Sequence, residues 1–256
     1  MGFDFTLEIY HELCSALRTN HYVCLTFSDY LQDNNKIKNK IAILRHDVDR
    51  KPSNALRMAE LENKLGIRST YYFRYPYTFN VDIIEKIIDL GHEIGYHYEV
   101  LSKTNGDCEK AKDLFKEELS KFREIYFVKT ICMHGSPLSK YDNRSLWKAY
   151  DFKSFGIIGD FYLSIDKDID YFSDTGRNWN LKNKSRDYII GKTERFLIST
   201  TSELIDLIEG DKISKICIVA HPERWTAYRI EWFHSYFKDY IYNIGRYLLY
   251  RNRKML

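Results

Sequence analysis

Short apolar segments alternate with segments of helical periodicity along most of the chain. The apolar segments are rich in β-branched and aromatic residues, which is typical of strands, and they lie at 41–44, 68–73, 92–99, 131–133, 155–158 and 216–220. Between them, apolar residues recur every three or four positions, which predicts helices at 55–65, 81–90, 111–122 and 202–208. Strands that alternate with helices form βα units and a parallel sheet. The pattern therefore predicts an α/β fold, with a barrel favoured over an open sheet because the sequence has no glycine-rich nucleotide loop.

The chain offers no obvious place to divide it. It has 256 residues with only 12 Gly and 4 Pro, and it contains no internal repeat, low-complexity tract or linker. A chain of this length buries roughly 70–75% of its unfolded surface, which is enough for a substantial core. We therefore expect one domain over 1–256, with a polar loop at 32–40 and the chemically informative segments between about 41 and 225.

Composition narrows the class of protein and its compartment. Apolar residues make up 44% and charged residues 29%, as in ordinary globular proteins, and 39 Lys and Arg against 36 Asp and Glu leave a net charge of +3. This balance is too mild to favour nucleic acid as the main partner. No apolar stretch approaches the ~20 residues of a membrane helix, and the acidic start lacks a signal-peptide pattern. Five widely spaced cysteines without a C-x-x-C pair indicate a reducing compartment, so we expect a cytoplasmic protein.

Polar side chains gather where four predicted strands end. They are His46, Asp47 and Asp49 after 41–44, His97 and Glu99 in the segment 92–99, His134 after 131–133, and His221 after 216–220. The carboxyl ends of parallel strands meet at one edge of the sheet, where α/β proteins place their chemistry, so we expect these side chains on the same face. Each histidine alone is more simply explained as a structural or loop residue, but four at equivalent places favour a site.

The spacing of these residues suits a divalent metal such as zinc. Asp47 and Asp49 are two positions apart on an extended chain, so both carboxylates face the same way, and the same holds for His97 and Glu99. Two close carboxylates repel each other unless one binds a cation or holds a proton. We therefore expect one aspartate to bind the metal and the other to act as general base. His97 and Glu99 complete a mixed nitrogen–oxygen site, and His221 on another strand can act as the acid.

A structural explanation also exists for the two aspartates. Asp49 shortly precedes a predicted helix and could cap it. Arg45, Arg50 and Arg57 are nearby partners for salt bridges. The metal site is favoured over this explanation because other strands deliver matching side chains.

Four segments resemble the polysaccharide deacetylases, the NodB-type family 4 carbohydrate esterases. Residues 44–49 (LRHDVD) look like the family's first motif, where a strand ends in two acidic residues, and residues 66–73 (GIRSTYYF) are similar to its second strand. Residues 91–97 (GHEIGYH) are close to the second motif, and residues 218–222 (IVAHP) resemble the last motif with its catalytic histidine. The second motif is the most specific, and the segments follow the family's order over roughly 41–225. Within the family, the RHDVD form with TYYFR looks like the WbmS-type branch, which is associated with surface-polysaccharide loci.

The resemblance implies a distorted (β/α) barrel, a divalent metal and hydrolytic removal of an acyl group from an amino sugar. The metal is expected to be zinc, with cobalt, nickel or manganese as alternatives. Carried over position by position, the resemblance implies that Asp47 is the general base, that Asp49 and His97 are metal ligands, and that His221 is the general acid. We expect the tetrahedral oxyanion to rest on the metal and on a backbone N–H of the turn at 137–138.

The chain departs from the family's pattern at two motifs. The family's second metal histidine falls on Leu101, which cannot bind a metal, and Glu99 is our candidate replacement. In the third motif, Gly135 stands where the family has an arginine. We expect the neighbouring His134 to bind substrate or metal instead.

Three further side chains are candidate substrate contacts. Residues 174–179 (DTGRNW) stand where the family orients its base and lines its pocket, which suggests substrate-binding roles for Arg177 and Trp179. Arg74 ends the segment 68–73 and is a candidate anion-binding residue for a nucleotide- or lipid-diphosphate sugar. The tyrosines at 71, 72, 75 and 77 could stack on a sugar, although aromatic residues in a strand more often fill the core.

The segment from about 228 to 250 is predicted to form an amphipathic helix. Its apolar and aromatic residues follow helical spacing, and basic residues trail them at 246, 251, 253 and 254. A basic amphipathic helix can lie on a membrane surface. Packing of this last helix on the barrel is the favoured explanation, and membrane contact is the alternative.

These observations predict a cytoplasmic, metal-dependent hydrolase that removes an acyl group from an amino sugar in surface-polysaccharide synthesis. One alternative is a hydrolase of the same fold that acts on a small non-sugar amide. The other is a binding or scaffold protein on a decayed deacetylase barrel. Leu101 supports decay, whereas the retained Asp47, Asp49, His97 and His221 oppose it.

Overall fold

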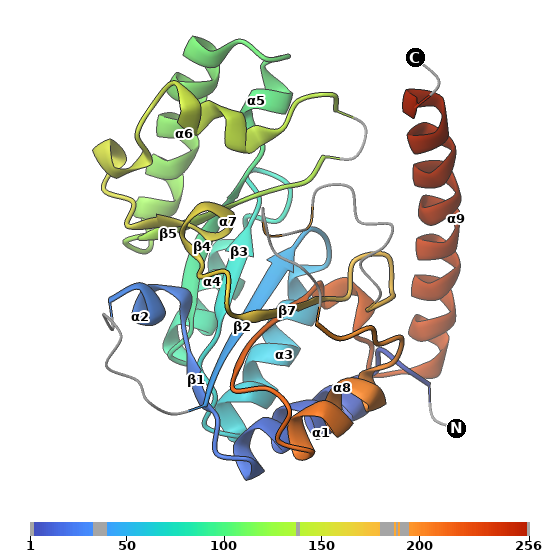
Figure 1. Cartoon of the computed structure of the whole chain (residues 1–256). Helices are drawn as coiled ribbons and strands as arrows, with labels where there is room; N and C mark the ends of the chain where they lie inside the picture. Colours follow the sequence, from blue (N-terminus) through green and yellow to red (C-terminus); the bar gives the residue numbers. More distant parts are fainter. Residues whose placement is uncertain are drawn as a thin grey trace.

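Eight parallel strands form one sheet in the computed structural model (Figure 1). The structure describes residues 3–32, 40–136, 139–179, 187, 189 and 195–254, with side chains up to 245 in the last range. The strand order is β6-β5-β4-β3-β2-β8-β7, and β1 pairs with β2 off this path. The strands are β1 Val23–Leu25, β2 Ile41–Val48, β3 Thr70–Phe73, β4 Glu93–Tyr98, β5 Thr130–Met133, β6 Gly159–Asp160, β7 Asp170–Ser173 and β8 Lys215–Ala220.

The two halves of β2 have different neighbours. Residues 41–43 pair with β1 and residues 45–48 pair with β3, while residues 41–46 pair with β8 on the other edge. Within the described residues, the end strands β6 and β7 do not pair with each other, so the barrel stays open. The predicted α/β class and the distorted (β/α) barrel are confirmed.

Helices connect the strands, as the alternation in the sequence predicts. Several begin at side chains that accept a hydrogen bond from the first turn: Asn80 for α4, Asp107 for α6, and Thr200 with Glu203 in a capping box for α8. The α-helices are α1 Leu7–Thr19, α2 Phe27–Gln32, α3 Pro52–Lys64, α4 Val81–Asp89, α5 Val100–Lys103, α6 Cys108–Arg123, α7 Phe161–Ser164, α8 Thr201–Glu209 and α9 Arg229–Lys254. The 3₁₀ turns are η1 Asn143–Lys148, η2 Phe152–Phe155 and η4 Pro222–Arg224.

Alternating side chains of β2 and β8 feed two separate apolar clusters. In β2, Ile43 belongs to the cluster that includes residues of α4 and α6, whereas Ala42 and Leu44 belong to the cluster with α1 and α8. The side-chain period of two in a strand separates the two faces in this way. From 42 to 47, odd-numbered residues of β2 therefore share one face of the sheet and even-numbered residues the other, whereas Val48 at the end of the strand joins the cluster of Ile43.

Two predicted strands differ from the structure. The predicted 41–44 strand continues to Val48, so Asp47 lies within β2 rather than after it. The predicted 155–158 strand is wrong: η2 ends at Phe155, Gly156 takes a left-handed conformation with φ of 72°, and only 159–160 are extended. A left-handed residue ends a helical turn and is incompatible with a continuous strand.

The predicted C-terminal helix is confirmed, and α9 lies along one side of the molecule (Figure 1). Its first turns contact the rest of the chain through the ring of Phe3, which lies 4.7 Å from the Trp232 ring, and through polar atoms. The Trp232 indole donates to the carbonyl of Asp4 at 2.6 Å, and the Arg177 guanidinium donates to Asp239 at 3.1 Å. Packing against the body, the favoured prediction for this helix, therefore holds for one of its faces.

Candidate functional site

Three histidines from three strand ends meet around one carboxylate. The Oδ1 atom of Asp49, just after β2, lies 3.4 Å from Nε2 of His97 on β4 and 3.5 Å from Nε2 of His134 after β5. The Asp49 Oδ2 atom lies 4.0 Å from Nε2 of His221, which follows β8. The carboxyl ends of the parallel strands therefore bring these side chains to one place.

The Asp49 carboxylate has an unfilled position toward the imidazoles. Its Oδ1 atom is buried and has no hydrogen-bond partner of acceptable geometry. Burial raises the pKa of Asp49, but His134 and His97 outweigh burial and hold that pKa well below its usual range. An ionised oxygen beside two imidazole nitrogens is a donor set that suits a divalent cation such as zinc. These three residues therefore fit a metal.

Both imidazoles are oriented by partners at their other ring nitrogen. Nδ1 of His97 lies 3.0 Å from the carbonyl of Cys132, and Nδ1 of His134 lies 2.9 Å from Oε2 of Glu99. A hydrogen bond donated by Nδ1 directs Nε2 toward the centre, as in metal sites whose histidines are held by carbonyl or carboxylate partners. Burial lowers the pKa of His134, but Asp49 and Glu99 raise it to about 9. A cation bound here would replace the Nε2 proton.

Glu99 has a different place from the one expected of a metal ligand. Its Oε1 accepts from Arg74 at 2.6 Å, and its Oε2 accepts from His134 at 2.9 Å and from the Ser136 hydroxyl at 2.8 Å. Burial raises the pKa of Glu99, but the hydrogen bond to His134 and the Arg74 charge hold it well below its usual range. Both oxygens are thus occupied, so the expectation that Glu99 is a ligand is corrected: it orients His134. Leu101 packs in the apolar core.

A second set of donors shares His97 with the first. Ligand atoms of Asp47, His97 and Cys132 all lie within 4.8 Å of one another. However, both Asp47 oxygens accept hydrogen bonds from Arg45, at 2.8 and 2.5 Å. Burial is the main cause that raises the pKa of the Cys132 thiol well above its usual value, which disfavours the thiolate that binds metals. The set of Asp49, His97 and His134 therefore fits a cation better.

Asp47 is held as an ionised carboxylate beside this set. Its Oδ2 lies 3.7 Å from Nε2 of His97. Burial raises the pKa of Asp47, but the charges of Arg45 and His97 outweigh burial and lower it. The fully buried Arg45 is in turn fixed by the Tyr162 hydroxyl at 2.9 Å. Arg45 therefore holds Asp47 in place as an ionised carboxylate.

His221 is part of a buried polar relay. Its Nδ1 lies 2.5 Å from Oδ1 of Asp174, which also accepts from Arg224 at 2.8 Å. The other Asp174 oxygen accepts from the His221 backbone N–H and from the Trp225 indole, each at 2.9 Å. Burial and Arg224 lower the pKa of His221, but Asp174 and Asp49 outweigh them and raise it. Asp174 opens the segment 174–179 (DTGRNW), but the sequence alone does not predict this role for it.

Arg177 and Trp179 do not line the site. The Trp179 side chain is 2% exposed, packs in the cluster with α1 and α8, and donates to Thr201 at 3.0 Å. Arg177 is buried under α9, where it donates to Asp239 and to Ser235. Their predicted substrate-binding roles are wrong, because both side chains are buried and hydrogen-bonded to distant segments of the chain.

His46 also points away from the site. It lies on the even-numbered face of β2, where its Nε2 is 2.7 Å from Oε1 of Glu62 in a fully buried cluster. Of the four histidines expected on one face, three lie there: His97, His134 and His221. His92, which alternation places opposite to His97, is likewise structural, with its Nε2 3.0 Å from the carbonyl of Ala59.

The tyrosines around Arg74 divide between core and surface. Tyr71 and Tyr72 are fully buried in the core, whereas Tyr77 is 61% exposed and lies against the Arg74 guanidinium at 4.7 Å. The Arg74 charge is already paired with Glu99. The turn at 137–138, which is expected to supply an oxyanion donor, lies outside the described residues.

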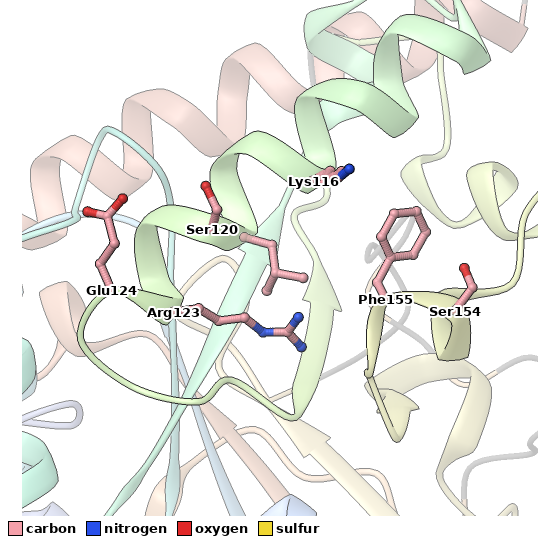
Figure 2. Close-up of a pocket in the computed structure, with 7 residues that line it drawn as sticks. Lys116, Ser120, Arg123, Glu124, Ser154 and Phe155 are labelled. Carbon is pink, nitrogen blue, oxygen red and sulfur yellow. The ribbon is translucent and has the colours of Figure 1, made fainter.

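A groove of about 500 Å³ lies elsewhere, between α6 and η2 (Figure 2). Its lining includes Lys116, Arg123 and Phe155. The Arg123 guanidinium donates to the carbonyls of Val128 and Gly156, which accounts for its position there. None of the residues that meet around Asp49 line this groove.

Comparisons with known proteins found similarity at the level of solved structures. No protein-family model and no curated protein matches the chain. The Xyl-CE4 domain of a multidomain xylanase from the hindgut metagenome of Trinervitermes trinervoides is 12% identical over 80% of this chain and 85% of that chain, with a TM-score of 0.41. A family 4 carbohydrate esterase from Bacillus anthracis is 15% identical over 93% and 86%, with a TM-score of 0.41. A CE4 family pseudoenzyme from Bacillus anthracis is 16% identical over 71% and 64%, with a TM-score of 0.40.

These three structures are of the carbohydrate esterase family that the motifs resemble. The similarity assigns no activity to this chain, and the WbmS-type branch stays a prediction. Among the described helices, none has both the length and the apolar character needed to cross a bilayer.

Proposed function

We propose that this protein is a metal-dependent hydrolase that removes an acyl group from an amino sugar of a surface polysaccharide or its precursor. The observation that carries the proposal is the meeting of Asp49, His97 and His134 around the unpartnered Oδ1 atom of Asp49. Asp47 and His221 lie beside this point as candidate base and acid. The motif resemblance supports the choice of an acylated amino sugar, whether nucleotide-linked, lipid-linked or polymeric.

Asp49, His97 and His134 would hold the metal, which we propose to be zinc, with cobalt, nickel or manganese as alternatives. When bound, such a cation lowers the pKa of a water and polarises the acyl carbonyl. Glu99 and the Cys132 carbonyl keep the two imidazoles aimed at the centre.

The chain's own groups can carry the protons of the hydrolysis. Asp47 accepts a proton from the attacking water while a C–O bond forms at the acyl carbon. His221 donates its Nε2 proton to the sugar nitrogen as the C–N bond breaks, which yields a carboxylic acid and a free amine. Asp174 and Arg224 hold the His221 ring in position through Nδ1.

Metal analysis and turnover of the purified full chain test this proposal. We expect about one divalent ion per chain, and release of acetate from N-acetylated amino-sugar oligomers that is lost in Asp47→Asn and in His221→Ala. His11→Ala, at an exposed histidine of α1, is the matched control and should keep both properties. Wild-type turnover in both Asp47→Asn and His221→Ala would contradict the assignment of these residues as base and acid.

The same experiment separates the two alternatives. No bound ion after addition of zinc, cobalt or nickel, together with no turnover, would indicate a scaffold on a decayed site. A bound ion with turnover only on small non-sugar amides would indicate the other hydrolase.

A further inference from the structure

Helix α9 packs on the protein through a polar face. Ser235 and Asp239 are buried, and they meet Arg177 and Arg50, with Asp239 3.3 Å from Arg50 and 3.1 Å from Arg177. One turn further, the Asn243 amide donates to the carbonyl of Gly176 at 2.8 Å. This face is held by hydrogen bonds and ion pairs, together with the Trp232 ring, which packs 4.7 Å from the ring of Phe3.

The opposite face of α9 is apolar and exposed. In the described part of the chain it is largely uncovered: Phe237 is 64% exposed, Ile230 is 74% exposed and Ile244 is 45% exposed, while the ring of Phe3 lies 5.8 Å from that of Phe233. At 100° per residue, six of the exposed apolar positions fall within an arc of about 100°, roughly opposite to Asp239, whereas the exposed Tyr236 and Tyr242 lie outside this arc. We call this arc the outer stripe of α9, and it consists of Ile230, Phe233, Phe237, Tyr240, Ile241 and Ile244. A surface helix normally shows the reverse polarity, with its apolar stripe toward the core.

The exposed charged residues that border the outer stripe without an acidic partner in the same helix are cationic. Helical geometry places Arg229 on one side of the stripe and Lys238 on the other, and both are exposed. The acidic residues of the helix are engaged elsewhere: Glu231 pairs with Arg57 at 3.4 Å, and Asp239 is buried. The outer stripe therefore has a positive border.

We propose that the outer stripe of α9 lies on an anionic membrane surface. A contiguous exposed apolar patch of this kind marks an interaction site. Aromatic rings are favoured at the headgroup level of a bilayer, and cations beside them attract anionic lipids. Further basic residues follow the stripe in the sequence at 246, 251, 253 and 254.

A second copy of the chain fits the outer stripe less well. Paired helices favour branched aliphatic residues at their contact positions, whereas Phe233, Phe237 and Tyr240 occupy the middle of the stripe. Pairing two stripes would also bring Arg229 and Lys238 near the same cations of the other copy. The bordering charge thus selects an anionic surface.

The membrane proposal is independent of the proposed hydrolysis, because it concerns residues outside the candidate site. It is tested by sedimentation of the full chain with vesicles of phosphatidylcholine alone and with vesicles that also contain phosphatidylglycerol. We expect binding to the anionic vesicles only, and weaker binding as the salt concentration rises. A double variant, Phe237→Ser with Ile241→Ser, should lower the partition coefficient at least about tenfold, because it removes two apolar groups from the contact.

Two further variants keep the test specific. Phe127→Ser changes an equally exposed aromatic residue, 63% exposed and distant in sequence from α9, and should bind vesicles like the unmodified chain. Lys238→Glu should weaken binding to anionic vesicles while leaving the apolar stripe intact. Circular dichroism and thermal unfolding report whether each variant is folded.

Three outcomes would overturn the membrane proposal. One is the absence of binding to vesicles of either composition. Another is equal binding by the double variant and the unmodified chain. The third is a vesicle-independent dimer, seen by analytical ultracentrifugation, that the double variant abolishes, since the outer stripe would then be covered by a second copy.

Discussion

Glu99 accepts a hydrogen bond from Nδ1 of His134 at 2.9 Å, and this contact turns Nε2 of His134 toward Asp49. The two residues follow paired ends of neighbouring strands, because Tyr98 of β4 is in register with Met133 of β5. Leu101 cannot bind a metal. The His134 imidazole, which follows the adjacent strand β5, supplies a nitrogen beside Asp49 instead. In the proposed cation site, Glu99 would act through that imidazole.

Replacing Glu99 by Gln should weaken metal binding without abolishing it. The amide can still accept from His134, but it no longer carries the charge that supports this imidazole. Loss of such an orienting partner costs about 10- to 100-fold in metal affinity. Calorimetric titration of the metal-free chain with Zn²⁺ measures the change, and turnover should recover at saturating metal.

Two variants show whether the effect belongs to this contact. Glu117→Gln, at an exposed position of α6, should leave zinc affinity unchanged. His134→Ala should reduce affinity further than Glu99→Gln does. If Glu99→Gln removed zinc binding as completely as His134→Ala, Glu99 would itself be a ligand.

Replacing Asp174 by Asn should lower turnover while metal content stays the same. The buried Asp174 carboxylate accepts from His221 and Arg224, so it fixes the imidazole ring and favours its charged form. We expect turnover to fall by about 10²- to 10⁴-fold, as when a buried carboxylate partner of a catalytic histidine is neutralised. Steady-state kinetics on a confirmed substrate, together with metal analysis, check this.

A loss of metal from Asp174→Asn would instead mean that the substitution disturbs the whole strand edge. Asp206→Asn, on the distant helix α8, is the control for a neutralised carboxylate.

The parts of the fold that local periodicity determines were predictable from the sequence. Alternation of strands and helices predicts the α/β class, the strands β2, β3, β4, β5 and β8 and the helices α3, α4, α6 and α8, but it misses α1, β1 and β7. The period of two predicts that Asp47 and Asp49 face together. The same parity also separates His46 from Asp47, since adjacent residues of a strand face opposite sides. The prediction grouped the strand-end histidines without regard to this alternation. It therefore wrongly placed His46 with the residues of the candidate site.

The roles that depend on tertiary contacts were not predictable from local pattern. Glu99 meets His134 because of the register between β4 and β5, which the sequence does not reveal. Arg177 donates a hydrogen bond to Asp239, which is 62 residues away in the chain. Likewise, Asp174 meets His221 only because β7 pairs with β8.

Gly95→Ala should destabilise the protein at the centre of the sheet. A Cβ at this position of β4 would lie 2.2 Å from the Tyr72 ring and 3.2 Å from the Thr130 carbonyl. Tyr72 is fully buried and its hydroxyl donates to Thr130 at 3.0 Å, so the ring cannot move aside freely. Overpacking of this kind costs about 1–3 kcal/mol, which urea denaturation measures.

Gly245→Ala is the matched control for this substitution. Its added Cβ meets nothing within 4 Å and lies inside α9, where Ala is favoured over Gly. Equal stability changes of the same sign in both variants would contradict the packing explanation at Gly95.

Replacing Glu62 by Gln should destabilise the protein at neutral pH and remove one cause of its acid sensitivity. The Glu62 carboxylate is fully buried and accepts hydrogen bonds from Tyr10, His46, Ser69 and Tyr71. Burial raises the pKa of Glu62, but His46 and the other donors outweigh burial and lower it from 4.5 to about 2. The unfolded state therefore binds the proton first as the pH falls. The resulting stabilisation is fully present above pH 4.5 and is lost as the pH falls toward 2.

The difference in unfolding free energy between the two chains should depend on pH in the same window. We expect Glu62→Gln to cost about 2–4 kcal/mol at pH 7, because it leaves buried donors and an imidazole without the carboxylate. The difference should narrow as the pH falls through that window, as measured by urea denaturation at several pH values. Glu60→Gln, exposed on the same helix, should show no such trend. A difference that stays constant from neutral to acid pH would mean that Glu62 is not held as an ionised acceptor in the folded protein.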